Sequence, residues 1–370
     1  MTDLFLLAAE PSADLQGSLL AQKLLEIDPR LKLSSVAGPK MRALGLSQVL
    51  PMEELQVMGF IDVLLALPKL ARTFFKLRST ILEMNPKAVI CIDYPGFNLR
   101  LERSLRRKGY RGKLIHYVCP TVWAWGKKRI PLMANNLDLL LTFLPFEPKC
   151  FSSTALDVRY VGHPLVCSIQ NHSYNSTFPK KKILSLFPGS RKTEIERNLP
   201  LQWECAKKLQ AEYPELTVAV SLSHEQFRPL VREVIGEKAW ICPPEQNYDL
   251  MKQTYLALAT SGTVILELGL HQVPTVVTFA IKPWDVFIAR NILRIRLPFY
   301  SIVNIILQKE VFPELFGPHL SKENLLHQAR ELFSSRRELC KKDLKELIAA
   351  LGTNDAAFQA AKAIAEKANL

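Results

Sequence analysis

The sequence predicts an α/β fold of two Rossmann-like domains, with a cleft between them and a helical segment near the C-terminal end. The chain has 370 residues, which is more than one ordinary hydrophobic core accommodates. Short apolar runs alternate with helical patterns almost throughout, as in parallel sheets covered by helices on both faces. After residue 320 only helical patterns remain, at Lys322–Ser334, Arg336–Ala350 and Asp355–Asn369.

The apolar runs form two groups, one in each half of the chain. The strands expected in the first half are Leu4–Ala8, Leu33–Ala37, Ala88–Ile92, Leu114–Val118, Leu139–Phe143 and Val158–Val161. Those expected in the second half are Ile183–Phe187, Leu216–Ser221, Ala239–Cys242, Leu256–Ala259 and Val273–Phe279. A polar, basic segment at 163–182 separates the groups. We therefore expect one domain at 1–165, a second at 180–350, and a last helix at 351–370 that packs back on the first domain.

Composition narrows the class of protein. Hydrophobic residues make up 48% of the chain and charged residues 22%, which is typical of a globular protein. No apolar stretch reaches the roughly 18 residues that span a bilayer, and the start lacks the basic region of a signal peptide. These features predict a cytoplasmic protein. The seven cysteines are an odd number without a CxxC pair, which argues against a disulfide framework or a metal site.

The net charge of +13 predicts attraction to polyanions such as nucleic acid, anionic lipid or a phosphorylated substrate. No nucleic-acid-binding motif accompanies the charge, so a nucleic-acid partner is not expected. Basic residues instead cluster beside apolar stretches, which favours a membrane surface. Two such stretches are Val57–Arg78 and Trp284–Tyr300.

The first of these stretches has the pattern of a basic amphipathic helix. Its apolar positions at helical spacing include Leu67, Leu70, Phe74 and Leu77. Its basic residues on another face are Lys69, Arg72 and Lys76. Two interpretations fit this pattern: an interfacial helix whose apolar residues face a membrane, and a core helix with a solvated basic side.

A loop of phosphate-binding character follows the expected strand Ile183–Phe187. Gly189 allows the backbone to approach a ligand closely, and Ser190 supplies a hydroxyl. The guanidinium of Arg191 suits phosphate oxygens. A plain turn with a solvated arginine is the competing interpretation.

A second such loop follows Leu256–Ala259. Ser261, Gly262 and Thr263 precede a helical pattern whose first-turn N–H groups would form an anion site, with Ser261 or Thr263 as its cap. Glu267 falls one turn further along the same face, where a carboxylate could accept both hydroxyls of a ribose. An ordinary cap with an exposed glutamate is the alternative.

Acidic residues follow two expected strands of the first half. Asp93 leaves Ala88–Ile92 at a Pro-Gly turn, where it is a candidate general base or the side chain of an Asx turn. Glu10 follows the first strand and is expected to point toward the cleft. Ser12 and Asp14 crowd the start of the next helix, where capping also explains them.

Two tryptophans follow the expected strand Leu114–Val118. Trp123 and Trp125 precede the basic run Lys127–Arg129. This combination could stack on a sugar or hold phosphate. Packing in the core is the rival interpretation, above all for Trp123.

These motifs, in this order, resemble those of the lipid-A-disaccharide synthase family, bacterial glycosyltransferases with the two-Rossmann GT-B architecture. The matching stretches are AAEPSADLQG, VAGPKMRALG, EELQVMGFIDVL, IDYPGFN, HYVCPTVWAWGKKRI, LTFLPFEP, VGHPL, LFPGSRKTEIE, ATSGTVILE and VNIILQKEVFPELF. The resemblance implies that UDP-2,3-diacylglucosamine is joined to 2,3-diacylglucosamine 1-phosphate (lipid X), with inversion. The products implied are lipid A disaccharide 1-phosphate and UDP, formed without a cofactor or a metal.

The resemblance also implies roles for individual residues. Asp93 matches the essential acid of the family and would be the general base. Arg191 and the turn at 261–263 would stabilise the departing UDP, and Glu267 would bind its ribose. Asn304 would lie near the nucleotide. The first-loop residues that match the family are Glu10, which joins the catalytic set, and Ser12 and Asp14. The implied location is the anionic inner face of the cytoplasmic membrane, as a peripheral protein, and a homodimer is compatible with it.

Three positions depart from the family's pattern. Ala9 and Ala13 stand where its first loop, AGEASGD, has glycine, and Gly96 stands where aspartate is common. These departures are the basis of an alternative function, a catalytically weakened relative that binds membrane or UDP without turnover. A glycosyltransferase for another acceptor, such as a peptidoglycan intermediate, is a further alternative. A nucleic-acid-binding protein is suggested by the charge alone.

Overall fold

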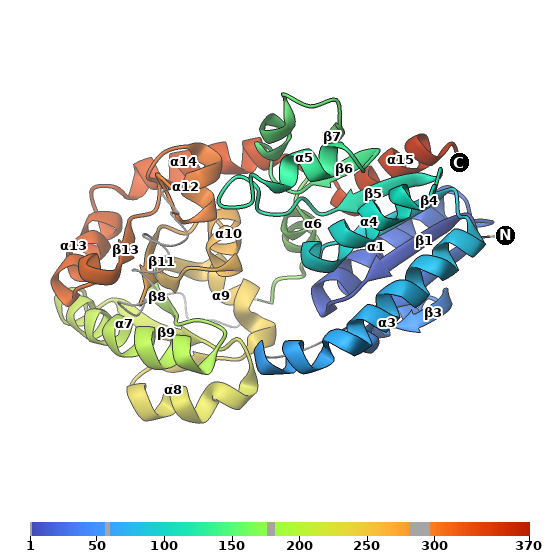
Figure 1. Ribbon diagram of the computed structural model, residues 1–370. Coiled ribbons are helices and arrows are strands. Elements are labelled where there is room, and N and C mark those ends of the chain that lie inside the picture. The colour runs from blue at the N-terminus through green and yellow to red at the C-terminus, as the bar shows by residue number, and fades with distance from the viewer. Residues whose placement is uncertain (1, 56–59, 176–181, 281–296) are drawn as a thin grey trace. The chain divides into compact units, whose positions relative to one another are not determined.

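The computed structural model describes residues 2–55, 60–175, 182–280 and 297–370 (Figure 1). The chain divides into two compact units. The first unit consists of Met1–Pro164 together with Asn354–Leu370, and the second of Leu165–Thr353. Each unit has its own parallel sheet and its own hydrophobic core.

The sheet of the first unit has seven parallel strands in the order β3-β2-β1-β4-β5-β6-β7. Their bounds are β1 Leu4–Ala8, β2 Leu33–Ala37, β3 Ser47–Pro51, β4 Ala88–Ile92, β5 Lys113–Tyr117, β6 Leu139–Thr142 and β7 Asp157–Tyr160. All six strands expected from the sequence are confirmed, each within one residue at either end. The edge strand β3 was not expected, because its sequence SQVLP contains no apolar run and most of its residues are at least partly exposed.

The two faces of this sheet are covered by different helices. Alternate residues of β1 point to opposite faces, so Leu4 and Leu6 join one hydrophobic cluster while Phe5 and Leu7 join another. The first cluster includes residues of α1 (Pro11–Ile27) and α15 (Ala356–Ala368), and the second includes residues of α3 (Phe60–Met84) and α4 (Pro95–Arg107). The remaining α-helices and 3₁₀ turns before residue 164 are α2 Pro39–Arg42, η1 Met52–Glu54, α5 Arg129–Ala134 and η2 Glu147–Phe151.

The sheet of the second unit has six parallel strands in the order β10-β9-β8-β11-β12-β13. Their bounds are β8 Lys182–Phe187, β9 Leu216–Ser221, β10 Trp240–Cys242, β11 Thr254–Thr260, β12 Thr275–Phe279 and β13 Glu314–Phe316. The five strands expected here are confirmed, with ends that differ by up to two residues. The short edge strand β13 was not expected.

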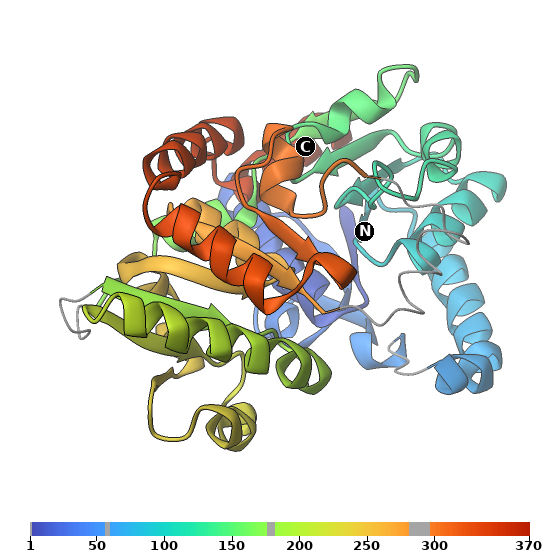
Figure 2. The same cartoon turned by 90° about the vertical axis from the view of Figure 1, so that its left-hand side faces the viewer.

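The helices of the second unit form groups around this sheet (Figure 2). α7 (Lys192–Glu212) packs beside α13 (Lys322–Phe333), and α10 (Thr263–Leu270) contacts α12 (Ile302–Leu307) and α14 (Arg337–Leu351). The others are α6 Pro164–Gln170, η3 Glu225–Phe227, α8 Arg228–Ile235, η4 Pro244–Gln246, α9 Asn247–Gln253 and η6 Gly317–His319. The prediction that only helices follow residue 320 is confirmed.

The expectation that the apolar residues of α3 face a membrane is wrong for the residues that can be described. Leu77 is fully buried in the core of the first unit, and Leu70 and Phe74 pack against the same cluster. Lys69, Arg72 and Lys76 are exposed, so this is a core helix with a solvated basic side. Residues 57–59, the side chain of Leu67 and most of the stretch 284–300 lie outside the part that the structure describes. Among the described helices, none is long and apolar enough to cross a bilayer.

Each sheet has one point at which its strand order reverses direction. In the first sheet this point lies between β1 and β4, and in the second between β8 and β11. Helix connections on either side of such a point leave in opposite directions, which opens a crevice at the carboxyl ends of the two strands. The loops after these four strands are therefore the places where each unit can bind a ligand.

Candidate functional site

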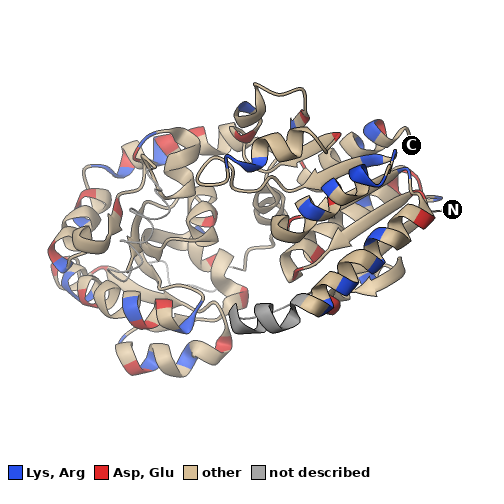
Figure 3. Cartoon of the chain, in the orientation of Figure 1, with Lys and Arg blue, Asp and Glu red and all other residues tan. Residues whose placement is uncertain are grey.

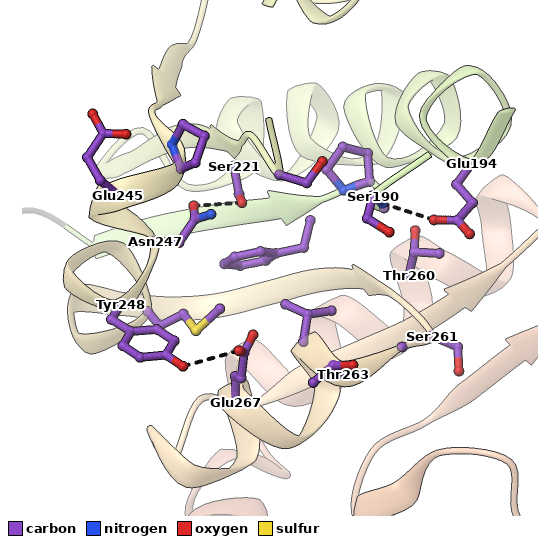
Figure 4. A pocket seen from close by; sticks show the side chains of 18 of the residues that line it. Ser190, Glu194, Ser221, Glu245, Asn247, Tyr248, Thr260, Ser261, Thr263 and Glu267 are labelled. Carbon is purple, nitrogen blue, oxygen red and sulfur yellow. Dashed lines mark hydrogen bonds between the residues drawn. The ribbon is translucent and has the colours of Figure 1, made fainter. Parts of the chain in front are cut away.

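A pocket of about 520 Å³ lies at the strand reversal of the second unit (Figure 4). The loops after β8 and β11 line one part of it, and η4 with the start of α9 lines another. The residues expected to bind a nucleotide that line this pocket are Gly189, Ser190, Ser261, Gly262, Thr263 and Glu267. The structure thus brings together two loops that lie about 70 residues apart in the sequence.

The loop after β8 is shaped by a close approach between Gly189 and Glu194. Gly189 has a φ of +121°, and a Cβ atom at this position would lie 2.6 Å from the Glu194 side chain. A carboxylate oxygen of Glu194 accepts a hydrogen bond from the Ser190 backbone N–H at 2.9 Å. The other oxygen lies 3.2 Å from Nη1 of Arg191. Glu194, which lines the pocket, therefore binds both the Ser190 backbone N–H and the Arg191 guanidinium.

Arg191 itself is not among the residues that line the pocket. Its side chain is 80% exposed and is held at the rim by its ion pair with Glu194. An exposed guanidinium can reorient at little cost, because such surface pairs contribute about 1 kcal/mol or less.

The loop after β11 leads into α10 without a side-chain cap. The N-cap residue is Gly262, and no side chain accepts a hydrogen bond there, so the expectation that Ser261 or Thr263 caps this helix is wrong. The first N–H groups of α10 consequently lack the usual capping oxygen at the pocket wall. Such a helix start favours an anion by its N–H groups and its dipole. The Thr260 side chain, 1% exposed, adds a hydroxyl that has no partner among the described residues.

Glu267 lies one turn into α10 and lines the pocket beside Tyr248 of α9. The hydroxyl of Tyr248 donates to its Oε1 at 3.3 Å. Burial raises the pKa of Glu267, and the hydrogen bond from Tyr248 offsets part of this effect. The ring of Tyr248 in turn packs edge-on against His172, with 5.2 Å between centroids. A carboxylate beside aromatic rings suits the ribose and base end of a nucleoside better than its phosphates.

Asn304 does not line the pocket, and its expected role near the nucleotide is not supported. Its side chain is fully buried. Oδ1 accepts the N–H groups of Val311 and Phe312, each at 2.9 Å, while Nδ2 donates to the Phe312 carbonyl and to Glu314. Asn304 therefore ties α12 to the segment that enters β13, which is a structural role.

A second pocket, of about 450 Å³, lies at the strand reversal of the first unit. Asp93 and Ser12 line it, together with Trp125 and Arg129. Asp93 and the following Tyr94 have φ values of +51° and +47°, a backbone conformation that is unusual for residues other than glycine. The Asp93 carbonyl accepts a hydrogen bond of 2.6 Å from Nδ2 of Asn98, which helps to hold this turn. Backbone conformations of this kind concentrate at functional sites.

Glu10 and Asp93 lie close enough to interact electrostatically. Burial raises the pKa of Glu10, and the negative charge of Asp93 raises it further. Glu10 precedes α1 and is partly buried, although it is not among the residues that line the pocket. The carboxyl groups that follow β1 and β4 therefore lie near each other, as the strand order leads one to expect.

Asp14 has a structural role instead of the expected role in the acceptor loop. It is 2% exposed. Its carboxylate accepts the backbone N–H groups of Gly38, Lys40 and Met41 at 2.8 to 3.1 Å, so that it anchors the start of α2. These donors belong to the N-cap and the first residues of α2, more than twenty residues away in the sequence.

The two tryptophans lie in different environments. Trp125 is 58% exposed, lines the pocket of the first unit and stacks with Arg129 at 4.8 Å. Trp123 packs edge-on against Phe146 and hydrogen-bonds Glu147, whose burial raises the pKa of its carboxyl to about 8. Trp125 is therefore available to a ligand, while Trp123 is half-buried and packs against Phe146.

Ala9 and Ala13 occupy ordinary backbone conformations. Both side chains are buried, and neither residue is among the described residues with a positive φ. Alanine consequently carries no backbone strain at these positions, although the family pattern has glycine there. The described residues also contain no group of three or more His, Cys, Asp or Glu that could hold a metal ion.

Sequence reasoning missed several lining residues, among them Glu194, Tyr248 and Thr260. Glu194 and Thr260 belong to the motifs LFPGSRKTEIE and ATSGTVILE. Their position in these motifs could have identified them as site residues. Tyr248 stands in no such motif. It reaches the pocket because α9 packs against β8, a contact that no local pattern reveals.

Two units of this kind, each a parallel sheet with a pocket at its strand reversal, define the GT-B class of fold. A solved structure described as the glycotransferase of kitacinnamycin is similar to this chain with a TM-score of 0.66 at 13% identity, covering 99% of both chains. The chain belongs to the lipid-A-disaccharide synthetase family, whose sequence model matches residues 4–368.

Curated relatives agree with this membership. The lipid-A-disaccharide synthase of Chlamydia pneumoniae is 40% identical over 326 residues, which is 85% of this chain and 54% of the relative. The one of Rhodospirillum centenum is 36% identical over 338 residues, covering 87% of this chain and 82% of the relative. The chain thus spans about half the length of the chlamydial relatives and most of the Rhodospirillum one.

Proposed function

We propose that this protein is an inverting glycosyltransferase that joins UDP-2,3-diacylglucosamine to 2,3-diacylglucosamine 1-phosphate and releases UDP. One observation carries the proposal: the family match runs through both units, across the strand-end loops that line both pockets. Family membership supports the substrates, and the pockets supply groups suited to a nucleotide and to a general base.

The pocket of the second unit would receive UDP. In this proposal the start of α10, with Gly262 and Thr263, faces the diphosphate, where its uncapped N–H groups stabilise negative charge. Glu267 accepts the ribose hydroxyls, and Tyr248 and His172 border the base. The diphosphate displaces the Glu194 carboxylate and takes over Ser190 N–H and Arg191 as donors.

The pocket of the first unit would receive the acceptor. As the 6-hydroxyl oxygen of the acceptor attacks the anomeric carbon, Asp93 removes its proton, and the bond from that carbon to the UDP oxygen breaks. The anomeric carbon inverts because attack and departure are in line. Glu10, whose pKa is raised, would remain protonated to higher pH than an ordinary glutamate and keep a second negative charge away from Asp93.

We further propose that the protein works at the anionic inner face of the cytoplasmic membrane. Exposed Lys69, Arg72 and Lys76 on α3 would approach the headgroups, and arginine residues also lie along α4 (Figure 3). Attraction of this kind is electrostatic and weakens with salt. It does not require insertion of Leu70, Phe74 and Leu77 of α3, which pack in the core.

UDP release from the two purified diacyl substrates is the direct test. We expect turnover with both substrates present and none with either omitted. A UDP titration by calorimetry, done in parallel, distinguishes the proposed enzyme from the alternative, a weakened relative that binds UDP without turnover. UDP binding without release in the presence of both substrates would support that alternative and contradict the proposed reaction.

A further inference from the structure

The 165–353 unit has a second cavity, of about 530 Å³, at the amino ends of its strands. The pocket proposed to bind UDP, called the nucleotide pocket from here on, lies at the opposite, carboxyl ends. The second cavity is lined by the first residues of β8 and β11, whereas the nucleotide pocket lies at their last residues. We call this cavity the basic basin and define it by Lys182, Lys252, Tyr255, His271, Arg337 and Lys341. None of these residues takes part in the proposed reaction.

The charge of the basic basin is one-sided. Four full positive charges and one imidazole line it, and no Asp or Glu is among its lining residues in the described part of the chain. Lys182 pairs with Glu215 at 3.3 Å, but both side chains are more than 40% exposed, so this pair neutralises little of the local field. Concave surfaces lined by one sign of charge concentrate counter-ions of the other sign.

Two of the cations are held in place by one aromatic ring. The guanidinium carbon of Arg337 lies 3.4 Å from the centroid of the Tyr255 ring, and Nζ of Lys182 lies 5.0 Å from it. Nη1 of Arg337 also donates to the Tyr255 carbonyl. A guanidinium has five N–H donors, so stacking and this one bond leave donors that can bind an oxyanion.

Burial acts on two ionisable groups of the basin. It lowers the pKa of Arg337, and the negative charges of neighbouring groups, Glu338 among them, offset part of this effect. Burial lowers the pKa of His271, and the charge of Lys252 lowers it further. An anion in the basin would relieve both effects, because it favours the charged form of each group.

We propose that the basic basin binds a phosphate group, carried either by a free phosphate ester or by the headgroup of a membrane lipid. Lysine and arginine side chains around a shallow cavity match the oxygens of a phosphate, and Tyr255 fixes the orientation of the central guanidinium. The proposal does not depend on the proposed reaction, since the basin and the nucleotide pocket share no lining residue.

Phosphate binding can be measured on the full chain saturated with UDP, so that the nucleotide pocket is filled. Inorganic phosphate is titrated while the imidazole signals of His271 are followed by NMR. Vesicles of phosphatidylcholine, with and without phosphatidylglycerol, are tested by co-sedimentation. The variant is Lys252→Gln with Lys341→Gln, and the matched control is Lys342→Gln with Lys345→Gln, two exposed lysines of α14.

We expect the basin variant to bind the phosphate source about tenfold more weakly than the wild type and the control, as the loss of two nearby charges implies. Movement of the His271 signals by inorganic phosphate identifies a free phosphate as ligand. Loss of binding to anionic vesicles alone identifies a lipid headgroup.

Equal binding by the basin variant and the control overturns the proposal, and so does a wild type that binds neither probe. UDP affinity, measured on all three proteins, should be the same. Failure of the wild type to bind UDP would count against the proposed reaction, but it would not bear on phosphate binding by the basic basin.

Discussion

At the scale of single residues, Asp93 carries the proposed chemistry. Its φ of +51° is tolerated by asparagine as well as by aspartate, so Asp93→Asn should keep the local backbone. We expect kcat to fall by about 10²- to 10⁴-fold, since a general base is lost. The affinity for UDP should stay within about twofold, because the residues of the nucleotide pocket belong to the other unit. Steady-state UDP release and calorimetry measure the two quantities, and a parallel loss of UDP affinity would make Asp93 structural.

Glu194 leads to a prediction in the opposite direction. Its carboxylate occupies donors that a diphosphate would use, so Glu194→Gln should tighten UDP binding by about three- to tenfold, the effect of one removed repulsive charge. The gain should be smaller for UMP and absent for uridine. Glu196→Gln, on the same helix and exposed, is the matched control. Weaker UDP binding by the Glu194 variant would mean that Glu194 positions Arg191 in the bound state.

Sequence patterns correctly identify those site residues that directly follow a strand. They fail for residues whose hydrogen-bond partners lie far away in the sequence. Gly189, Ser190 and Asp93 lie at the carboxyl ends of strands that the apolar pattern reveals, and each lines a pocket. Asp14 and Asn304 look equally functional in the sequence. Their side chains are occupied by backbone groups of other segments, which only the folded chain brings near.

At the scale of elements, α3 shows why an amphipathic pattern does not identify what covers its apolar face. A helical stripe of apolar residues can be covered either by a membrane or by the core of the same protein. Leu70, Phe74 and Leu77 face the core of the first unit. The strands were easier to predict, because most central strands are buried on both faces and are rich in apolar residues, whereas the edge strands β3 and β13 are not.

The corrected orientation of α3 can be tested by stability. Leu77→Ala should lower the free energy of unfolding by about 2 to 5 kcal/mol, since it removes a fully buried side chain. Phe75→Ala is the control on the same helix. Phe75 is 53% exposed and contacts Phe74 and Arg78, so its loss should cost about 1 kcal/mol or less. Denaturant titration followed by circular dichroism compares them, and equal effects would contradict the packing described.

At the scale of the whole molecule, the last helix belongs to the unit in which the chain begins. α15 contributes Ala360, Ala361 and Ile364 to the same core cluster as β1. Its ends are tied by Arg159 to Glu366 at 2.7 Å and by the Asp355 carboxylate, which caps the helix. The first unit is therefore built from two separate stretches of chain, with the second unit inserted between them.

Removal of 354–370 should consequently destabilise the first unit by several kcal/mol while UDP binding persists. The buried apolar surface of α15 and its ion pairs are lost together, whereas every residue lining the nucleotide pocket remains. Calorimetry should detect the loss of one thermal transition, and a UDP titration should give nearly unchanged affinity. Removal of only the exposed Asn369 and Leu370 is the control. Equal loss of UDP affinity in the shorter protein would mean that the second unit cannot fold without the first.

The return of α15 has a consequence for how the protein emerges from the ribosome. The strands of the first sheet are translated before the 165–353 unit, whereas α15, which covers one of their faces together with α1, is translated after it. During that interval the apolar face around Leu4 and Leu6 has only the α1 part of its cover, and the part that α15 will cover can recruit a chaperone or a neighbouring nascent chain. The inserted unit, whose residues are continuous in sequence, is free to acquire its structure first.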